Sequence, residues 1–272
     1  MLPNIYRQPT TEPIGEAWIL SCLGENNSRI DDKTTLADVV KANPNLIAKD
    51  YQGEFPLLIK LIDANDDLSI QVHPQSKTEF WHIISPTPSK LYFGFKKDTT
   101  KDEVENLLKQ GQITSILNYI DVSAGDSYLI NPGTIHAIGK GTFLIEIQQN
   151  VDATYRLFDY NRVDADGKPR ELHIEQALYC INYNQTRVFE NKSFEHIMQT
   201  SFFNVFKYHV TDKKQLDATE KSFHALVVLS GNGNLKAGDQ NIALNQYDTY
   251  FIPAGTGVYE LSGDVTVIVA TI

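Results

Sequence analysis

Two polar motifs, far apart in the chain, each lie at the end of a strand-like segment, and together they restrict how the chain can fold. The first is Gln71-Val72-His73-Pro74, followed closely by Glu79. The second is Pro132-Gly133-Thr134-Ile135-His136, which follows a Gly125-Asp126 turn and a short predicted strand at residues 127–130. Imidazole nitrogens, a carboxylate and a side-chain amide suit a divalent first-row metal such as zinc or iron. A fold that unites these motifs must bring separate strands around one centre.

The residues around the first motif alternate as a strand does. Ile70 and Val72 face one way, whereas Gln71 and His73 face the other, and Glu79 opens the next predicted strand. A single histidine on a strand is more often structural than a ligand. Two half-motifs in this order, joined by turns and strands, resemble the metal motif of the cupin fold. They favour a metal site formed by Gln71, His73, Glu79 and His136.

The composition is ordinary for a soluble globular protein and excludes several classes of partner. The chain has 272 residues, of which 42% are hydrophobic and 21% charged. A net charge of -10 argues against nucleic acid as a partner, because phosphate backbones require clustered Lys and Arg. A small anionic substrate remains compatible, since a few local cations can dominate one cleft.

The expected compartment follows from what the sequence lacks. No apolar run is long enough to span a bilayer, and the N-terminus shows no secretory signal pattern. Cys22 and Cys180 are too few for a disulfide framework, which is typical of a reducing compartment. We therefore expect a cytoplasmic protein without a membrane partner, and the sequence predicts no particular oligomeric state.

Strand-like segments dominate the organisation of the chain. They are rich in Ile, Val, Phe and Tyr and are separated by Gly, Asn, Asp and Pro turns, so we expect a mostly antiparallel β protein. Three helical segments interrupt them, at residues 36–42, at residues 100–117 with an interruption near Gly111, and at residues 170–180.

The last part of the chain resembles the first part, as in an incomplete internal repeat. Residues 223–233 resemble the strand-and-turn core of a second cupin, and residues 247–258 parallel residues 125–136. Val258 stands where His136 stands in the first copy, and its side chain cannot bind a metal. The fold class expected is mainly β, with two cupin-type (jelly-roll) domains and a few short helices. Residues 1–190 are the expected metal-binding catalytic domain, and residues 191–272 a degenerate domain without a metal site.

Longer stretches resemble one known family. Residues 71–79, 133–139 and 146–160 closely resemble the short bacterial form of type I mannose-6-phosphate isomerase, and the similarity covers most of residues 12–182. The resemblance implies one zinc ion per chain on Gln71, His73, Glu79 and His136, with an active-site arginine at Arg156. It also implies that the same pocket is lined by Glu16, Lys60, Lys77, Glu146 and Asp152.

The reaction implied by the resemblance is the interconversion of mannose 6-phosphate and fructose 6-phosphate through an enediolate. Arg156 could stabilise the developing negative charge without exchanging a proton. The base is open among Glu146, Glu16, Lys60 and Lys77. The expected catalytic residues are Arg156, Lys77, Glu146 and Lys60, and the expected substrate-binding residues are Glu16, Asp152 and Lys60.

Alternative interpretations exist for single residues and for the whole chain. Arg156 could instead form a structural ion pair with Asp152 or Asp159, and candidates for binding a phosphate group are Arg156, Arg162 and Lys168. A cupin oxygenase would use a similar ligand set around ferrous iron and consume oxygen. A non-catalytic cupin that binds sugar phosphates would retain metal and ligand binding without turnover.

Overall fold

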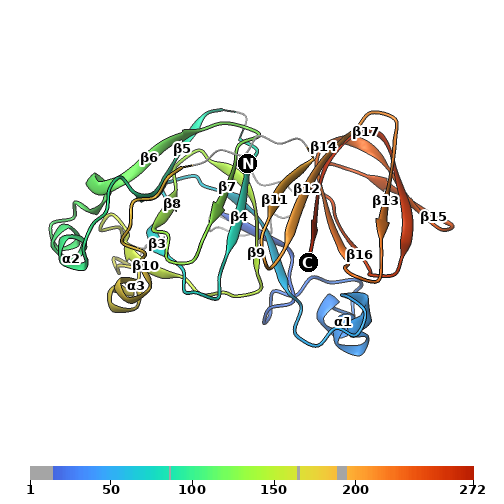
Figure 1. The fold of residues 1–272 in the computed structure, drawn as a ribbon, viewed down its shortest axis with the longest axis horizontal. Helices are drawn as coiled ribbons and strands as arrows, with labels where there is room; N and C mark the ends of the chain where they lie inside the picture. Colours follow the sequence, from blue (N-terminus) through green and yellow to red (C-terminus); the bar gives the residue numbers. More distant parts are fainter. Residues whose placement is uncertain (1–14, 86, 164–165, 189–194) are drawn as a thin grey trace. The chain divides into compact units, whose positions relative to one another are not determined.

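The structure is a computed structural model that describes residues 15–85, 87–163, 166–188 and 195–272. It is mainly β, as predicted, and its described residues form two compact units (Figure 1). Residues 15–17 and 61–188 make the first unit, and residues 18–60 and 195–272 make the second. None of the helices in the described ranges is long and apolar enough to cross a membrane.

Ten strands build the two sheets that contain the predicted metal motifs. Their bounds are β1 Glu16–Leu20, β2 Leu57–Asp63, β3 Ile70–Val72, β4 Glu79–Ile83, β5 Ser89–Phe95, β6 Leu117–Val122, β7 Ser127–Ile130, β8 His136–Ile138, β9 Phe143–Gln149 and β10 Tyr155–Phe158. One sheet has the order β1-β2-β9-β4-β7, and the other has the order β10-β3-β8-β5-β6. The division between the units falls within β1 and β2, whose residues belong to both.

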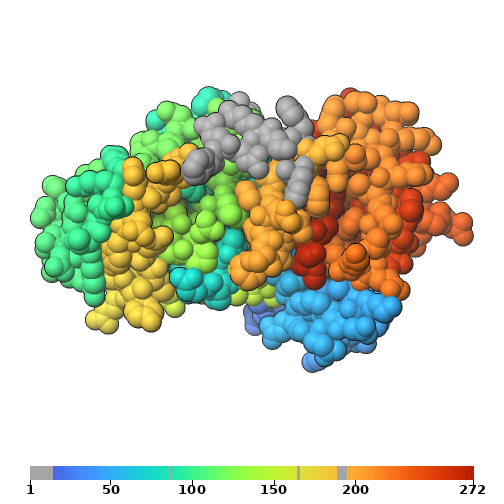
Figure 2. Space-filling view, in the orientation of Figure 1, coloured from blue at the N-terminus to red at the C-terminus, as the bar shows by residue number. Residues whose placement is uncertain are grey.

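The two faces of the second of these sheets differ in chemistry. One face packs against two helices, α2 (Lys101–Lys109) and α3 (Ile174–Cys180), which lie side by side on the surface in green and yellow (Figure 2). The buried cluster on this face includes Ile70, Val72, Ala137, Leu157, Val104, Ala177 and Leu178. Side chains alternate along strands, so Gln71, His136 and Arg156 project from the opposite face. This second face therefore holds the predicted polar site.

The second unit is a separate β structure with its own apolar core. Its strands are β11 His196–Gln199, β12 Asn204–Val210, β13 Lys213–Ala218, β14 His224–Ala237, β15 Gln240–Leu244, β16 Thr249–Ile252 and β17 Gly257–Thr271. The sheet has the order β11-β12-β17-β14-β15, with β13 on β17 and β16 on β14. Its core includes Leu226, Val228, Val267 and Val269. The same unit contains α1 (Leu36–Ala42) and a 3-10 turn, η2 (Pro44–Leu46).

Helix starts show how far local sequence determines this fold. The predicted helix at residues 36–42 is confirmed, and a reciprocal capping box between Thr35 and Asp38 begins it. The segment predicted over 100–117 is α2 followed by a short 3-10 helix, η3 (Ile113–Ile116), and Thr100 caps α2. Gly111 separates the two with a φ of 67°.

The helix predicted over residues 170–180 begins four residues late, at Ile174. Arg170 and Glu171, which precede the helix, form tertiary contacts instead of helical ones. Arg170 Nε donates to Asp159 Oδ2 at 2.8 Å, and the carbonyl of Glu171 accepts from Arg156 Nη1 at 2.8 Å. Tertiary hydrogen bonds therefore override the helical pattern in this turn.

The predicted domain boundary differs from the division of the structure in one segment. Residues 18–60, predicted to belong with residues 1–190, lie in the same unit as residues 195–272. The described parts of 61–188 lie in one unit with the metal motifs. The two predicted functional domains themselves stay a prediction.

The turn before His136 offers a test of this packing. Gly133 has a φ of +78°, and a Cβ there would lie 2.7 Å from the Cys180 carbonyl oxygen, whereas Gly141 has a φ of +84° with nothing within 4 Å. Both Ala variants carry the strain of a left-handed backbone, but only Gly133→Ala adds a clash. We expect Gly133→Ala to lose about 1–3 kcal/mol more unfolding free energy than Gly141→Ala. Urea unfolding followed by circular dichroism measures this difference, and equal losses would contradict the packing.

Candidate metal centre and active site

Three of the predicted ligands form a buried cluster in the first unit. His73 lies just after β3, Glu79 begins β4 and His136 begins β8. One donor atom from each lies within 4.8 Å of the others. His73 Nε2 is 3.0 Å from Glu79 Oε1, and His136 Nε2 is 4.0 Å from Glu79 Oε2. Among the His, Cys, Asp and Glu side chains of the described ranges, this is the group that could hold a metal.

Backbone carbonyls fix the tautomers of both histidines. His73 Nδ1 donates to the Ala153 carbonyl at 2.9 Å, and His136 Nδ1 donates to the Thr134 carbonyl at 2.8 Å. A carbonyl can only accept, so each Nδ1 carries a proton, and in the neutral form of each ring Nε2 keeps its lone pair toward the cluster. Hydrogen bonds of this kind orient metal-binding histidines in other proteins.

Burial and neighbouring charges set the protonation of the cluster. Burial by itself would raise the pKa of the Glu79 carboxyl, but the protonated form of His73 and the ammonium group of Lys77 hold that pKa well below its ordinary value. Burial, followed by the charge of His73, lowers the pKa of His136 to about 3. At neutral pH Glu79 is therefore a carboxylate and His136 a neutral imidazole, the forms in which these side chains bind metals.

Two atoms of the cluster are buried without a hydrogen-bond partner among the described residues, and both are suited to a cation. They are His73 Nε2 and Glu79 Oε2. His73 Nε2 can donate to Glu79 Oε1, 3.0 Å away, only when the ring is protonated. When the ring is neutral, both atoms are acceptors, and a metal ion could take the place of the proton between them. Unpaired buried acceptors cost about 1–3 kcal/mol each. A cation held by these atoms would remove that cost, so the donor set fits a divalent metal.

The fourth predicted ligand, Gln71, lies beside the cluster. Gln71 and His136 are register partners of β3 and β8, and Gln71 Nε2 lies 3.3 Å from His136 Nε2. In this arrangement the amide of Gln71 donates to the imidazole lone pair. Metal ligation would require the carbonyl oxygen of Gln71 in that place, which a half-turn of the carboxamide provides. Its role as a ligand stays a prediction.

Lys77 and Glu146 are buried next to residues of the cluster. Lys77 Nζ lies 2.9 Å from Glu79 Oε1, and its side chain is only 2% exposed. Glu146 Oε2 accepts a hydrogen bond of 2.8 Å from Trp81 Nε1. The Trp81 ring in turn meets the His136 ring edge to face, with centroids 5.3 Å apart. Trp81 therefore connects a candidate base to a candidate metal ligand.

Arg156 reaches the same face of the sheet through strand register. It is the partner of Gln71 in the pairing of β10 with β3. Its Nε donates to Ser69 Oγ at 3.3 Å and its Nη1 to the Glu171 carbonyl at 2.8 Å. Both of these acceptors are neutral oxygens. Burial lowers the pKa of Arg156, whereas the nearby carboxylates of Asp159 and Glu171 raise it.

The ion pair predicted as an alternative role for Arg156 is not formed. Asp159 pairs with Arg162 and Arg170 instead, and both guanidinium groups contact Asp159 Oδ1. Burial by itself would raise the pKa of Asp159, but hydrogen bonds from Arg170 and Arg162 lower it. Asp152 is exposed and forms no ion pair with Arg156 among the described contacts. Arg162 also approaches a second carboxylate, because its Nη1 lies 3.5 Å from Asp66 Oδ2. The two guanidinium groups of Arg162 and Arg170 therefore lie beside two carboxylates, those of Asp159 and Asp66.

The other predicted substrate residues lie in different settings. Glu16 is exposed at the first position of β1. Lys60 is buried in β2 and belongs to the second unit, where its Nζ lies 5.0 Å from the centroid of the Trp18 ring. The roles of Glu16, Asp152 and Lys60 stay predictions.

Sequence reasoning missed two buried side chains beside the predicted residues. Trp81 lies two positions after Glu79, and Gln148 lies two positions after Glu146, so each pair shares one face of its strand. Gln148 is also the register partner of Glu79. The alternation along β4 and β9 is the signal that could have found both.

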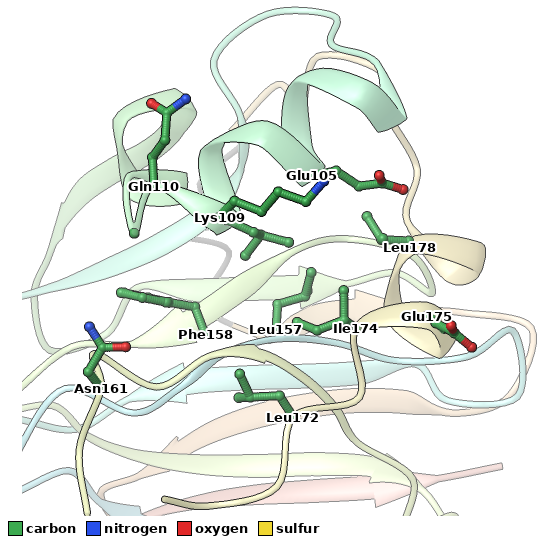
Figure 3. Close-up of a pocket in the computed structure, with 12 residues that line it drawn as sticks. Glu105, Lys109, Gln110, Leu157, Phe158, Asn161, Leu172, Ile174, Glu175 and Leu178 are labelled. Carbon is green, nitrogen blue, oxygen red and sulfur yellow. The ribbon is translucent and has the colours of Figure 1, made fainter.

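A cavity of about 560 Å³ lies on the helical side of the second sheet, away from the side chains of the cluster (Figure 3). It is lined by residues of α2, β10 and α3, and the Lys109 side chain extends across it toward Glu105. Leu157 lines it, whereas the preceding residue, Arg156, faces the cluster side. None of the predicted site residues lines this cavity.

Known proteins match both parts of the chain. Residues 3–103 match the family described as phosphomannose isomerase type I, catalytic domain, and residues 193–272 match the mannose-6-phosphate isomerase cupin domain. Mannose-6-phosphate isomerase ManA of Bacillus subtilis is 31% identical over 94% of this chain and 89% of its own length. The mannose-6-phosphate isomerase of Streptococcus mutans is 30% identical over 95% of this chain and 88% of its own length.

A solved structure supports the same assignment. The crystal structure of the mannose 6-phosphate isomerase from Bacillus subtilis matches with a TM-score of 0.86 and 30% identity, covering 95% of this chain and 90% of that one. Fold and cluster define a cupin with a candidate metal centre. The chain belongs to the type I mannose-6-phosphate isomerase family, and it is an isomerase of that class.

Metal binding by the cluster can be tested through stability. A metal that binds only the folded state at 100 times its Kd adds about 2.7 kcal/mol, so zinc should raise the Tm of metal-stripped protein. His136→Ala should abolish this rise. His82→Ala removes an equally buried histidine of β4, bonded to Ser127, and should lower the Tm while preserving the zinc effect. Thermal unfolding scans measure the Tm, and a zinc assay measures the bound metal. Stoichiometric zinc in His136→Ala would exclude His136 as a ligand.

Proposed function

We propose that this protein interconverts mannose 6-phosphate and fructose 6-phosphate, with one zinc ion bound by His73, Glu79, His136 and Gln71. The observation that carries the proposal is the buried cluster of two imidazoles, which can bind a metal in their neutral forms, and one carboxylate, in a chain of this family. The substrate comes from the names of the relatives, whose lengths this chain nearly covers. We also expect a cytoplasmic location, as for a metabolic isomerase.

Zinc would supply Lewis acidity toward an oxygen of the sugar when bound. His73 and His136 would hold it through Nε2, because both Nδ1 protons are committed to backbone carbonyls. Glu79 would contribute a carboxylate that is ionised before the metal arrives, since Lys77 and His73 lower its pKa. The protein thus prepares the ligand set in advance.

Isomerisation requires a proton to leave the carbon next to the carbonyl and to return to the neighbouring carbon. An enediolate forms between these two steps. Glu146 is the base that the contacts favour, because its carboxylate is buried and is oriented by the Trp81 indole. Lys77 is engaged with Glu79, and Lys60 lies in the second unit, so both are secondary candidates.

Arg156 would stabilise the negative charge of the enediolate. Its guanidinium faces the same side of the sheet as Gln71 and is bonded only to neutral oxygens. The neighbouring Arg162 and Arg170 pair with Asp159, and Arg162 also pairs with Asp66. We propose that these two guanidinium groups bind the phosphate group, since guanidinium groups form charge-assisted hydrogen bonds with phosphates. Lys168, Glu16 and Asp152 remain candidates for contacts to the sugar phosphate.

The experiment that tests the function is a coupled assay of mannose 6-phosphate conversion, on metal-stripped protein with and without zinc. Turnover that depends on added zinc would support both the reaction and the metal. Absence of turnover from folded, zinc-loaded protein would contradict the proposal. Oxygen uptake with ferrous iron would favour the oxygenase, and binding of the sugar phosphate without turnover would favour a non-catalytic cupin.

The role of Glu146 gives a sharper prediction. Glu146→Gln keeps the size of the side chain and an oxygen that can accept from Trp81, but it cannot take up a proton. We expect kcat to fall by about 10²–10⁴ while zinc content and Tm stay unchanged. Glu175→Gln, on the exposed side of α3, is the matched control and should retain full activity. Full kcat in Glu146→Gln would assign the base to another residue.

A further inference from the structure

Gln148 is a fully buried polar residue of the first unit, and its side-chain oxygen lacks a partner among the described residues. The residue is 0% exposed, and no hydrogen bond to Oε1 is formed there. It pairs with Glu79 in the register of β9 with β4. Residues paired across antiparallel strands share a face, with Cβ atoms about 4.5–5.5 Å apart. The Gln148 side chain therefore projects next to a candidate metal ligand.

The amide nitrogen of Gln148 fixes the orientation of the whole carboxamide. Nε2 donates to the Gln149 carbonyl at 2.9 Å and to the Val151 carbonyl at 2.8 Å. Carbonyls only accept, so a flipped amide would set Oε1 against two other acceptors. Oε1 is therefore held away from these carbonyls as an available acceptor.

The neighbouring residue shows what a purely structural glutamine looks like on this strand. Gln149 projects from the other face of β9, and its Oε1 accepts a hydrogen bond of 3.0 Å from the Thr78 amide. Its acceptor is satisfied within the protein. Gln148 differs in this one respect, and it shares its unpaired state with His73 Nε2 and Glu79 Oε2 of the cluster.

We propose that Gln148 Oε1 accepts a hydrogen bond from an O–H donor at the metal centre, and so belongs to the binding site. Retaining an unpaired buried acceptor costs about 1–3 kcal/mol, which an incoming donor would remove. The donor is either a hydroxyl of the sugar substrate or a water molecule at the metal centre. The first source rests on the proposed function, whereas the second does not.

The test compares Gln148→Met with Gln149→Met in the full chain. Met is close in size to Gln but offers no amide. For Gln148→Met we expect about a tenfold change, typical of one lost hydrogen bond, in either KM or zinc affinity. A raised KM for mannose 6-phosphate at saturating zinc identifies a sugar hydroxyl. Weaker zinc binding against a chromophoric chelator, with KM unchanged, identifies the water. Gln149→Met should lower Tm and alter neither value.

If Gln148→Met changes neither the KM for mannose 6-phosphate nor the zinc affinity more than Gln149→Met does, the proposal is overturned. Gln148 would then only anchor the segment that carries Val151. A second measurement uses the unmodified protein, in case Gln148→Met does not fold. A crystal structure with zinc and fructose 6-phosphate should place a non-protein oxygen about 2.6–3.2 Å from Gln148 Oε1, and none within that range would overturn the proposal. If the unmodified protein shows no turnover, the proposed function fails. The zinc affinity of Gln148→Met and the crystal structure with zinc and fructose 6-phosphate would still decide the role of Gln148.

Discussion

The site depends on a carboxylate that is buried and charged. Glu79 is 1% exposed, and a lone carboxylate in such a place would be strongly destabilising. Lys77, also almost fully buried, lies 2.9 Å from it and supplies the compensating charge. Removing either partner would leave an uncompensated buried charge. The pair therefore holds an ionised oxygen donor in place between two imidazoles, and the rest of the centre is arranged around that donor.

Strand register converts this local pair into a site. Gln71, His136 and Arg156 come from three different strands and become neighbours because β10, β3 and β8 pair in one register. Gln148 meets Glu79 by the same rule on β9 and β4. A slip of one residue in any of these pairings would turn the polar side chain to the opposite face, which on β3 packs against the helices. The apolar residues of each strand thus specify the position of the polar ones.

Local sequence patterns predicted the parts of this arrangement that depend on local physics. The capping box of Thr35 and Asp38 begins a helix wherever the chain runs next, so residues 36–42 could be predicted. Alternation placed Gln71 and His73 on one face, and the turn at Gly133 preceded His136 as expected. The bond from Trp81 to Glu146 could not be predicted, because it requires the register of two strands far apart in sequence. The assignment of residues 18–60 to the second unit is non-local in the same way.

The second unit shows that a β structure of this kind needs no buried ligand set. Its core is apolar, and Val258, which by the sequence prediction stands in the place of His136, is 58% exposed. His224 of this unit lies 2.8 Å from the Tyr259 hydroxyl through Nδ1, and burial lowers its pKa, so the pair is neutral and satisfied. The described part of this unit also has two buried side-chain oxygens without partners, Asn27 Oδ1 in a loop and Thr249 Oγ1 at the start of β16. In the first unit, by contrast, such acceptors gather around one centre, on His73, Glu79 and Gln148. Stability alone would favour the arrangement of the second unit, and the polar cluster of the first is therefore best explained by what it binds.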